Sequence, residues 1–272
     1  MEFGHYPTPA PLATAVKAVW FARGTKAEFE VPEPIVPDGC VELVLNLADR
    51  FVQVDAGHTL QPRDLLVGQM TRPTIAAPTG EVDLIGIRFW PSRAGAVLRT
   101  PMWELQDQLI AASSVMPVFA TLADDLRSLP RRARLARLTR VLAPLCARVE
   151  PARLRSVDTA LSRIASTHGI VSIAALASGT GVTRRHLERQ FREQVGLRVK
   201  QVARIARIQQ VLAVLQARPA HSGAEIAMRC GFSDQAHLIH ECRALTGRTP
   251  SRMLMSAEQS LSGLMRDCQP AV

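Results

Sequence analysis

The chain lacks the features of secreted and membrane-spanning proteins. Its five cysteines, Cys40, Cys146, Cys230, Cys242 and Cys268, are scattered, odd in number and never spaced as C-x-x-C. That pattern builds no disulfide framework and fits a reducing compartment. No apolar run is long enough to cross a bilayer. The N-terminus has no basic segment followed by an apolar one, as a secretory signal would have. We therefore predict a cytoplasmic protein with no membrane partner.

Catalytic signatures are also missing. The sequence contains no G-x-S-x-G, no phosphate-binding P-loop and no G-x-G-x-x-G. Residues 1–150 hold two histidines, His5 and His58, and no His-x-His cluster, which disfavours a metal-dependent barrel enzyme. Cys40 lies beside Glu42 and is either a reactive thiol or, more often for such a residue, a small buried apolar one. We predict a protein that is not an enzyme and binds no cofactor or metal.

The chain does have a substantial apolar content and a positive charge confined to one half. Hydrophobic residues make up 47% of the 272 residues, which predicts a packed core and not a disordered chain. Residues 151–272 hold 17 Lys and Arg against 8 Asp and Glu, whereas residues 1–150 hold 16 of each, so the net charge of +9 lies in the C-terminal half. Such a half is expected to bind polyanions, although an arginine-rich proteome is an alternative explanation.

The N-terminal half is predicted to be β-rich. Short aliphatic and β-branched runs bounded by Gly, Pro and Asp predict strands at 16–21, 41–47, 51–54, 65–70, 74–77 and 82–89. Their spacing is typical of a small antiparallel sandwich or barrel, which can enclose a small ligand.

Helical spacing begins after residue 91. It predicts helices at 92–98, 103–111, 120–129 and 132–149. The last of these has arginines on one face, predicted to be solvated, and a leucine stripe on the other, formed by Leu135, Leu138, Leu142 and Leu145. Leucines at this spacing either pack within their own chain or pair two chains, so a homodimer is an open prediction.

The basic half contains two stretches with the same plan of helix, glycine turn and capped helix, at about 172–193 and 224–246, joined by a helix at 199–216. Gly181 and Gly231 provide the turns, since glycine readily adopts positive φ. Thr183 and Ser233 are the predicted N-caps, and Gly247 with Pro250 is expected to end the last helix. Two helix-turn-helix units on one rigid linker can place both second helices in a DNA major groove, about one helical turn apart.

These residues resemble the DNA-binding domain of the AraC/XylS family of bacterial transcription regulators. The resemblance covers residues 155–255 and rests on 181–191 (GVTRRHLERQF), Gly196, Arg207, Ile226-Ala227, 231–238 (GFSDQAHL) and 246–250 (TGRTP). The chain departs from the family by having no proline shortly after Gly196, and by having Cys242 where phenylalanine is usual. The smaller Cys242 side chain predicts a less rigid second unit.

The N-terminal half resembles, more loosely, an uncharacterised domain found before this module in a subset of the family, through residues 37–47, 68–69 and 88–91. The family resemblance implies an α+β chain with a cupin-like barrel that senses an unknown small-molecule effector. We predict a sensor or dimerisation domain at 1–150, the DNA-binding domain at 151–255 and a tail at 256–272.

The resemblance also implies which side chains contact double-stranded DNA. Base contacts are expected from Arg185, Glu188 and Arg189 on the first recognition helix and from Gln235, Ala236, His237 and His240 on the second. Arginine matches guanine, glutamine matches adenine and alanine matches the thymine methyl group. Phosphate contacts are expected from Arg184, Arg192, Arg204 and Arg243. For Glu188, an ion pair with Arg184 or Arg192 on its own helix is the favoured alternative.

Two functions remain open on the sequence. The favoured one is a sequence-specific transcription regulator, which would contact RNA polymerase if it is an activator. The alternative is an enzyme or small-molecule binding protein whose basic C-terminal domain binds nucleic acid only non-specifically. A zinc site at His237, His240, Cys230 and Cys242 is disfavoured, because the resemblance places the histidines toward DNA and Cys242 inward.

Overall fold

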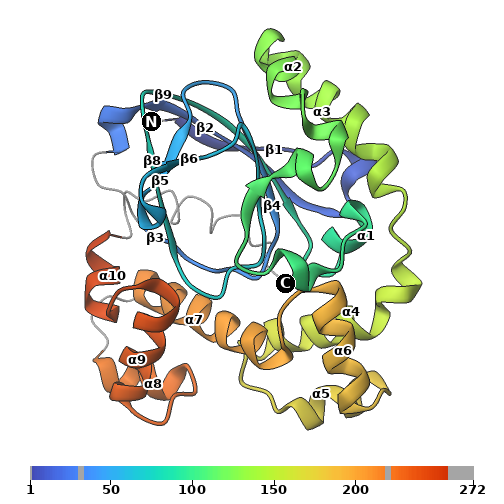
Figure 1. The fold of residues 1–272 in the computed structure, drawn as a ribbon. Coiled ribbons are helices and arrows are strands. Elements are labelled where there is room, and N and C mark those ends of the chain that lie inside the picture. The colour runs from blue at the N-terminus through green and yellow to red at the C-terminus, as the bar shows by residue number, and fades with distance from the viewer. Residues whose placement is uncertain (1, 30–33, 218–221, 257–272) are drawn as a thin grey trace.

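Two antiparallel sheets form the N-terminal half. The computed structural model describes residues 2–29, 34–217 and 222–256. The larger sheet has the strand order β1-β2-β9-β4-β7-β10 and the smaller has β3-β8-β5-β6. The larger consists of β1 (Glu2–Tyr6), β2 (Val16–Thr25), β4 (Glu42–Asn46), β7 (Asp64–Val67), β9 (Glu81–Phe89) and β10 (Leu109–Ala111). The smaller consists of β3 (Pro34–Ile35), β5 (Phe51–Gln53), β6 (Thr59–Leu60) and β8 (Thr74–Pro78). In Figure 1 the strands form a ring, as predicted for a barrel-like domain.

The larger sheet is buried on both faces. On one face Leu43 and Ile85 pack under helices, and on the other Trp20 and Leu84 pack toward Phe51 of the smaller sheet. This explains why the central strands are apolar almost continuously, since neither face meets water. The predicted α+β fold class is confirmed.

Most predicted strands are present, but one predicted helix is wrong. Residues 103–111 form a short 3-10 turn, Met102–Leu105, followed by strand β10. Asp107, at φ 57°, reverses the chain between them, and its carboxylate accepts hydrogen bonds from the backbone N–H (2.6 Å) and hydroxyl (2.7 Å) of Thr71. This clasp places β10 on β7. The short strands β1, β3 and β6 were also missed.

Three α-helices complete the N-terminal half: α1 (Ala94–Leu98) precedes β10, and α2 (Leu122–Ser128) and α3 (Arg131–Cys146) follow it. The leucines of α3 at 138, 142 and 145 are buried in the core of their own domain, so this stripe is not available to pair two chains. A dimer would need another surface and stays a prediction. Arg134 corrects the expected solvated face, because it is buried and paired with Asp83 at 2.7 Å.

The C-terminal half is helical. It contains α4 (Pro151–Ser166), α5 (Ile173–Thr180), α6 (Arg184–Gln194), α7 (Val199–Ala217), α8 (Gly223–Arg229), α9 (Gln235–Thr246) and α10 (Pro250–Ser256). The two main cores meet within α4, where Leu154 belongs to the first and Val157 to the second. The domain boundary at residue 150 stays a prediction, and residues 257–272 of the expected tail lie outside the described residues. No helix in the described ranges is long and apolar enough to span a membrane.

Candidate nucleic-acid interface

The first helix-turn-helix unit consists of α5 and α6. Gly181 ends α5 with φ 70°. Thr183 is the N-cap of α6, as predicted, and its hydroxyl accepts a hydrogen bond from the backbone N–H of His186 at 3.2 Å. Leu187 and Phe191 are fully buried. Because these two residues fix the inward face, Arg185 and Arg189 lie on the exposed side of α6.

The outward face of α6 is strongly basic. Arg184, Arg185 and Arg189 are exposed, and Glu188 is half-buried. A guanidinium nitrogen of Arg189 lies 3.1 Å from Nδ1 of His186, a neighbour that the sequence analysis did not single out. In the part of the chain that the structure describes, Glu188 makes no ion pair with Arg184 or Arg192. The favoured intrahelical role of Glu188 is therefore not seen.

The second unit consists of α8 and α9. Ser222 and Glu225 form a capping box at the start of α8, and Gly231 provides the turn with φ 70°. The predicted N-cap of α9 is wrong by one residue: Asp234 accepts from the backbone N–H of His237 at 2.7 Å. That hydrogen bond is the main cause that lowers the pKa of Asp234. Both Ser and Asp can cap, and the backbone conformation decides which of them does.

The outward face of α9 is polar but weakly charged. Gln235, Ala236 and His240 are exposed. His237 is half-buried, with its ring edge-on to Phe232 at 5.3 Å and its Nδ1 3.0 Å from Oγ of Ser233. His237 is thus held by the turn, whereas the other three side chains are exposed to solvent.

The end of α9 differs from expectation. Gly247 ends the helix with φ 71°, as predicted, but Pro250 begins α10 instead of closing the unit. Proline suits this position, because its missing N–H would have no partner in the first turn. Met253 of α10 is buried in the C-terminal core.

The four arginines expected at phosphates have different surroundings. Arg184 and Arg243 are exposed. Arg204 instead donates two hydrogen bonds to the Glu241 carboxylate, at 2.7 and 3.0 Å, which ties α7 to α9. Burial raises the pKa of Glu241, but the hydrogen bond and charge of Arg204 outweigh burial, so the net shift is downward. The guanidinium of Arg192 lies over the ring of Trp103 at 5.3 Å. The phosphate roles of Arg192 and Arg204 stay predictions.

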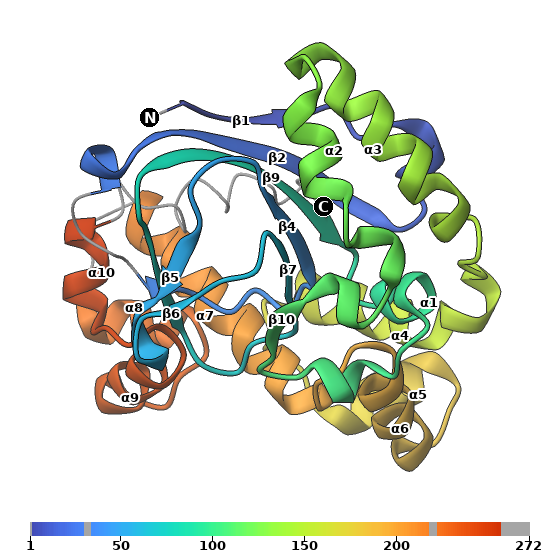
Figure 2. The same ribbon diagram turned by 45° about the horizontal axis from the view of Figure 1, so that its top comes forward.

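The linker helix α7 separates the two units. Its 19 residues span about 28 Å at 1.5 Å per residue. In Figures 1 and 2 the first unit lies at one end of α7 and the second at the other, both on the side away from the ring of strands. The length of α7 is thus comparable with one turn of a DNA duplex, roughly 34 Å.

The first unit also contacts the N-terminal domain, along a seam that sequence patterns did not reveal. Beside the Arg192–Trp103 contact, Gly196 after α6 lies so close to Met102 that a Cβ would be 2.5 Å from its carbonyl oxygen. Gly196 has φ 84°, so glycine is required there on both counts.

Polar contacts reinforce this seam. Arg93 donates to both carboxylate oxygens of Asp158 on α4, at 2.6 and 3.1 Å, and the Ser92 hydroxyl donates to the same carboxylate at 2.6 Å. Further along, the Gln209 side chain donates to the Pro37 carbonyl at 2.8 Å. The helical C-terminal half is therefore held to the N-terminal half by directional hydrogen bonds as well as by packing.

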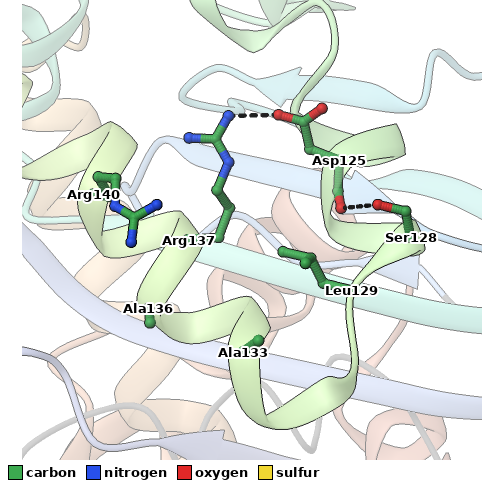
Figure 3. Close-up of a pocket in the computed structure, with 7 residues that line it drawn as sticks. All are labelled: Asp125, Ser128, Leu129, Ala133, Ala136, Arg137 and Arg140. Atoms are coloured by element: carbon green, nitrogen blue, oxygen red, sulfur yellow. Dashed lines mark hydrogen bonds and ion pairs between the residues drawn. The ribbon is translucent and has the colours of Figure 1, made fainter.

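A groove lies between α2 and α3, on the other side of the N-terminal domain from the second unit (Figures 1 and 3). Its volume is about 450 Å³, and it is lined by Asp125, Ser128, Leu129, Ala133, Ala136, Arg137 and Arg140. Arg137 is paired with Asp125 at 2.5 Å across it. The groove contains none of the expected DNA contacts.

The cysteines weighed as zinc ligands face away from the histidines. Cys230 and Cys242 are fully buried in the C-terminal core. Burial raises the pKa of Cys242 to about 12 and also raises that of Cys230. Zinc requires thiolates, so burial favours the neutral thiol and a packing role.

Comparison with known proteins divides the chain in the same way. Residues 4–111 match the model of a domain of unknown function (DUF6597), and residues 176–256 match a model described as a helix-turn-helix domain. A comparison with curated protein sequences gives no significant match.

Among solved structures the chain is similar to ToxT from Vibrio cholerae. One ToxT structure has a TM-score of 0.47 and 9% identity, covering 94% of this chain and 98% of that one. A structure of unsaturated fatty acid bound ToxT has a TM-score of 0.43 and 11% identity, covering 87% of this chain and 93% of that one. The helix-turn-helix match coincides with the two units built above from capping and packing. The chain thus carries an AraC-type helix-turn-helix domain at residues 176–256 behind a domain of unknown function at residues 4–111.

Proposed function

We propose that the chain binds double-stranded DNA with α6 and α9 in two successive major-groove segments, and that the N-terminal domain adjusts this binding in response to a small-molecule effector. The observation that carries the proposal is the pair of N-capped helices with outward polar faces at the two ends of α7. The protein acts in the cytoplasm as a regulator and not as an enzyme.

The side chains divide between base and phosphate contacts. Arg185 and Arg189 are exposed on α6 and match the acceptors of guanine, whereas Gln235 on α9 matches adenine. Ala236 fits a thymine methyl group, and His240 donates or accepts a hydrogen bond at a base edge. Glu188 and His237, which are half-buried, complete the proposed base contacts. With these roles, α6 is the more basic of the two DNA-reading surfaces.

Phosphate contacts position the protein without specifying sequence. Arg184 and Arg243 are exposed near the ends of the two recognition helices and suit this role. Arg192 can also contact a phosphate once its guanidinium moves off the Trp103 ring. In this proposal the seam is the route of regulation, because a ligand that shifts the N-terminal domain changes how α6 is held.

Selection of genomic DNA fragments with the full-length protein tests the proposal. At one fixed salt concentration, the recovered sequence is expected to bind roughly 10³-fold or more tightly than a scrambled fragment. Affinity that follows salt and ignores sequence would instead support the alternative of a non-specific nucleic-acid binder. Run-off transcription on the recovered fragment then separates activation, which requires RNA polymerase contact, from repression.

The effector is sought separately. A thermal-shift screen of the full-length protein detects ligands, since anything that binds the folded state alone raises its stability. A true effector also changes the affinity for the recovered DNA, and that affinity is measured with and without each hit. Sedimentation at several concentrations establishes whether the DNA-bound form is a monomer or a dimer.

A further inference from the structure

One side chain joins the turn that precedes the first helix-turn-helix unit to the turn within the second. Arg207, in the middle of α7, donates a hydrogen bond from Nη2 to the carbonyl of Gly169 at 3.2 Å and one from Nη1 to the carbonyl of Gly231 at 3.3 Å. Its guanidinium also lies over the ring of Phe232 at 5.3 Å. We call Gly169, Ile170, Arg207, Gly231 and Phe232 the central joint.

The Gly169 side of the joint lies directly on α7. Gly169 is in the turn between α4 and α5, with φ 76°. A Cβ at Gly169 would be 2.0 Å from the carbonyl oxygen of Ala203 and 3.1 Å from the backbone nitrogen of Arg207. Only glycine permits this approach, and the approach brings the Gly169 carbonyl within reach of the Arg207 side chain.

On the Gly231 side of the central joint, Ile170 at the entrance of the first unit packs closely against Gly231. Gly231 is the turn of the second unit, and a Cβ there would be 2.8 Å from the side chain of Ile170. Ile170 follows Gly169 directly, so the entrance of the first unit touches the turn of the second. The guanidinium of Arg207 bridges the carbonyls on the two sides of this contact.

The joint leads on to a recognition helix. Phe232 contacts both Arg207 and His237: the guanidinium lies over its ring, and the imidazole is perpendicular to it, each at 5.3 Å from the ring centroid. His237 is in the first turn of α9. A displacement of Arg207 therefore changes the support of the N-terminal turn of α9, which is the part that enters a major groove first.

We infer that Arg207 is a positioning residue that fixes the separation and mutual rotation of α6 and α9, and thereby selects the spacing between the two half-sites on DNA. The inference rests on the proposed function. Two binding surfaces on a rigid link bind as one, whereas a loosened link lowers the effective concentration of the second surface. Lysine cannot replace arginine here, because a single ammonium lacks the planar fork that reaches two carbonyls.

The test uses the full-length protein and the DNA recovered by selection. Four probes are prepared: the recovered site, the site with either half scrambled, and the site with one base pair inserted between the halves. Arg207→Lys and Arg207→Leu are expected to lose about tenfold or more in affinity for the complete site. Their affinity for each half-scrambled probe stays at the wild-type value, and the penalty for the inserted base pair shrinks.

A matched control removes charge without touching the joint. Arg198 is exposed just before α7, so Arg198→Leu keeps the wild-type spacing preference. Thermal melting identifies any variant that has lost its fold, and Arg207→Lys, which keeps the charge, serves if Arg207→Leu does not fold.

Each outcome decides between the two claims. If scrambling one half of the site costs the wild-type protein nothing, the proposed two-helix function fails before any variant is considered. If the wild type needs both halves but the Arg207 variants keep its spacing preference, the function stands and the positioning role is wrong. Equal losses on complete and half-scrambled probes also overturn that role, because they indicate simple destabilisation.

Discussion

The two helix-turn-helix units share a plan but differ in charge and in attachment. The first has four exposed arginines on α6 and contacts the N-terminal domain through Trp103 and Met102. The second has neutral side chains on the outward face of α9 and is tied to the linker helix by Arg204 and Glu241. Under the proposed function, the difference predicts that the first unit supplies more of the electrostatic attraction to DNA and responds to the N-terminal domain, while the second unit reads bases from a support that changes less.

The largest expected effect is on the first recognition helix. Arg189→Ala should cost about 1–3 kcal/mol of DNA binding and relax the preference at one base pair, because a bidentate contact to guanine is lost. Gln235→Ala in the second unit is the matched variant and should cost less, with no change in salt dependence. Binding titrations and repeated selection with both variants measure this. An equal or larger loss from Gln235→Ala would contradict the proposed division.

The attachment of the first unit is tested next. Asp158→Asn weakens the ion pair between Arg93 and Asp158. The Arg93 side chain is only 16% exposed and that of Asp158 31%. Hydrogen bonds to charged groups contribute about 1.5–3 kcal/mol, so the seam should open more often. Hydrogen exchange is expected to accelerate in 102–105 and in α6 but not in α9. Glu150→Gln removes a surface pair with Arg153 and is the control, since exposed pairs contribute little. Acceleration in α9 as well would show that the units are not attached separately.

A smaller effect is expected at Trp103. Trp103→Leu removes the ring beneath Arg192, a contact of about 0.5–1 kcal/mol at an exposed site. The freed guanidinium becomes available for a phosphate, so DNA affinity should rise about two- to fivefold and the slope of log affinity against log salt should steepen by about one. Trp90→Leu removes a ring that lies under Lys17 and is the control. Unchanged affinity and slope in Trp103→Leu would remove Arg192 from the phosphate contacts.

The smallest expected effect is a pH-dependent change in stability through the Arg204–Glu241 pair, which ties α7 to α9. The folded pKa of Glu241 is lowered by Arg204 despite burial. The pair therefore contributes stability above the unfolded pKa of about 4.3, and this contribution is lost as the pH falls through the folded pKa. The melting temperature of the wild type should exceed that of Glu241→Gln at pH 7, and the gap should close as the pH falls below about 4. A gap that is independent of pH would mean that charge pairing is not its cause.

Local chemistry in the sequence predicted much of the C-terminal domain. Glycine turns, the Thr183 cap and the inward pairs at Leu187 and Phe191 follow from spacing within a few residues, and the structure has them. The cap of α9 was placed one residue early, because Ser233 and Asp234 are both competent and only the backbone distinguishes them.

Contacts between distant segments could not be predicted in this way. The stacking of Arg192 on Trp103 and the clasp of Arg93 on Asp158 join parts of the chain whose local patterns give no sign of each other. In the sequence, nothing distinguishes Arg204 from the other arginines of the basic domain. Only the fold places it beside Glu241. Strand β10 was missed for the same reason, since its pairing with β7 depends on Asp107 reversing the chain.

The single helix α7 has a consequence for the shape of the target. Regulators that pair two identical chains about a two-fold axis read palindromes. Under the proposed function, one chain holds two unlike DNA-reading helices, α6 and α9, at the ends of α7, so a monomer has no such axis. Its site on DNA is then asymmetric, with two different ends. Reversing that site beside a gene reverses the orientation of the bound protein and of its N-terminal domain.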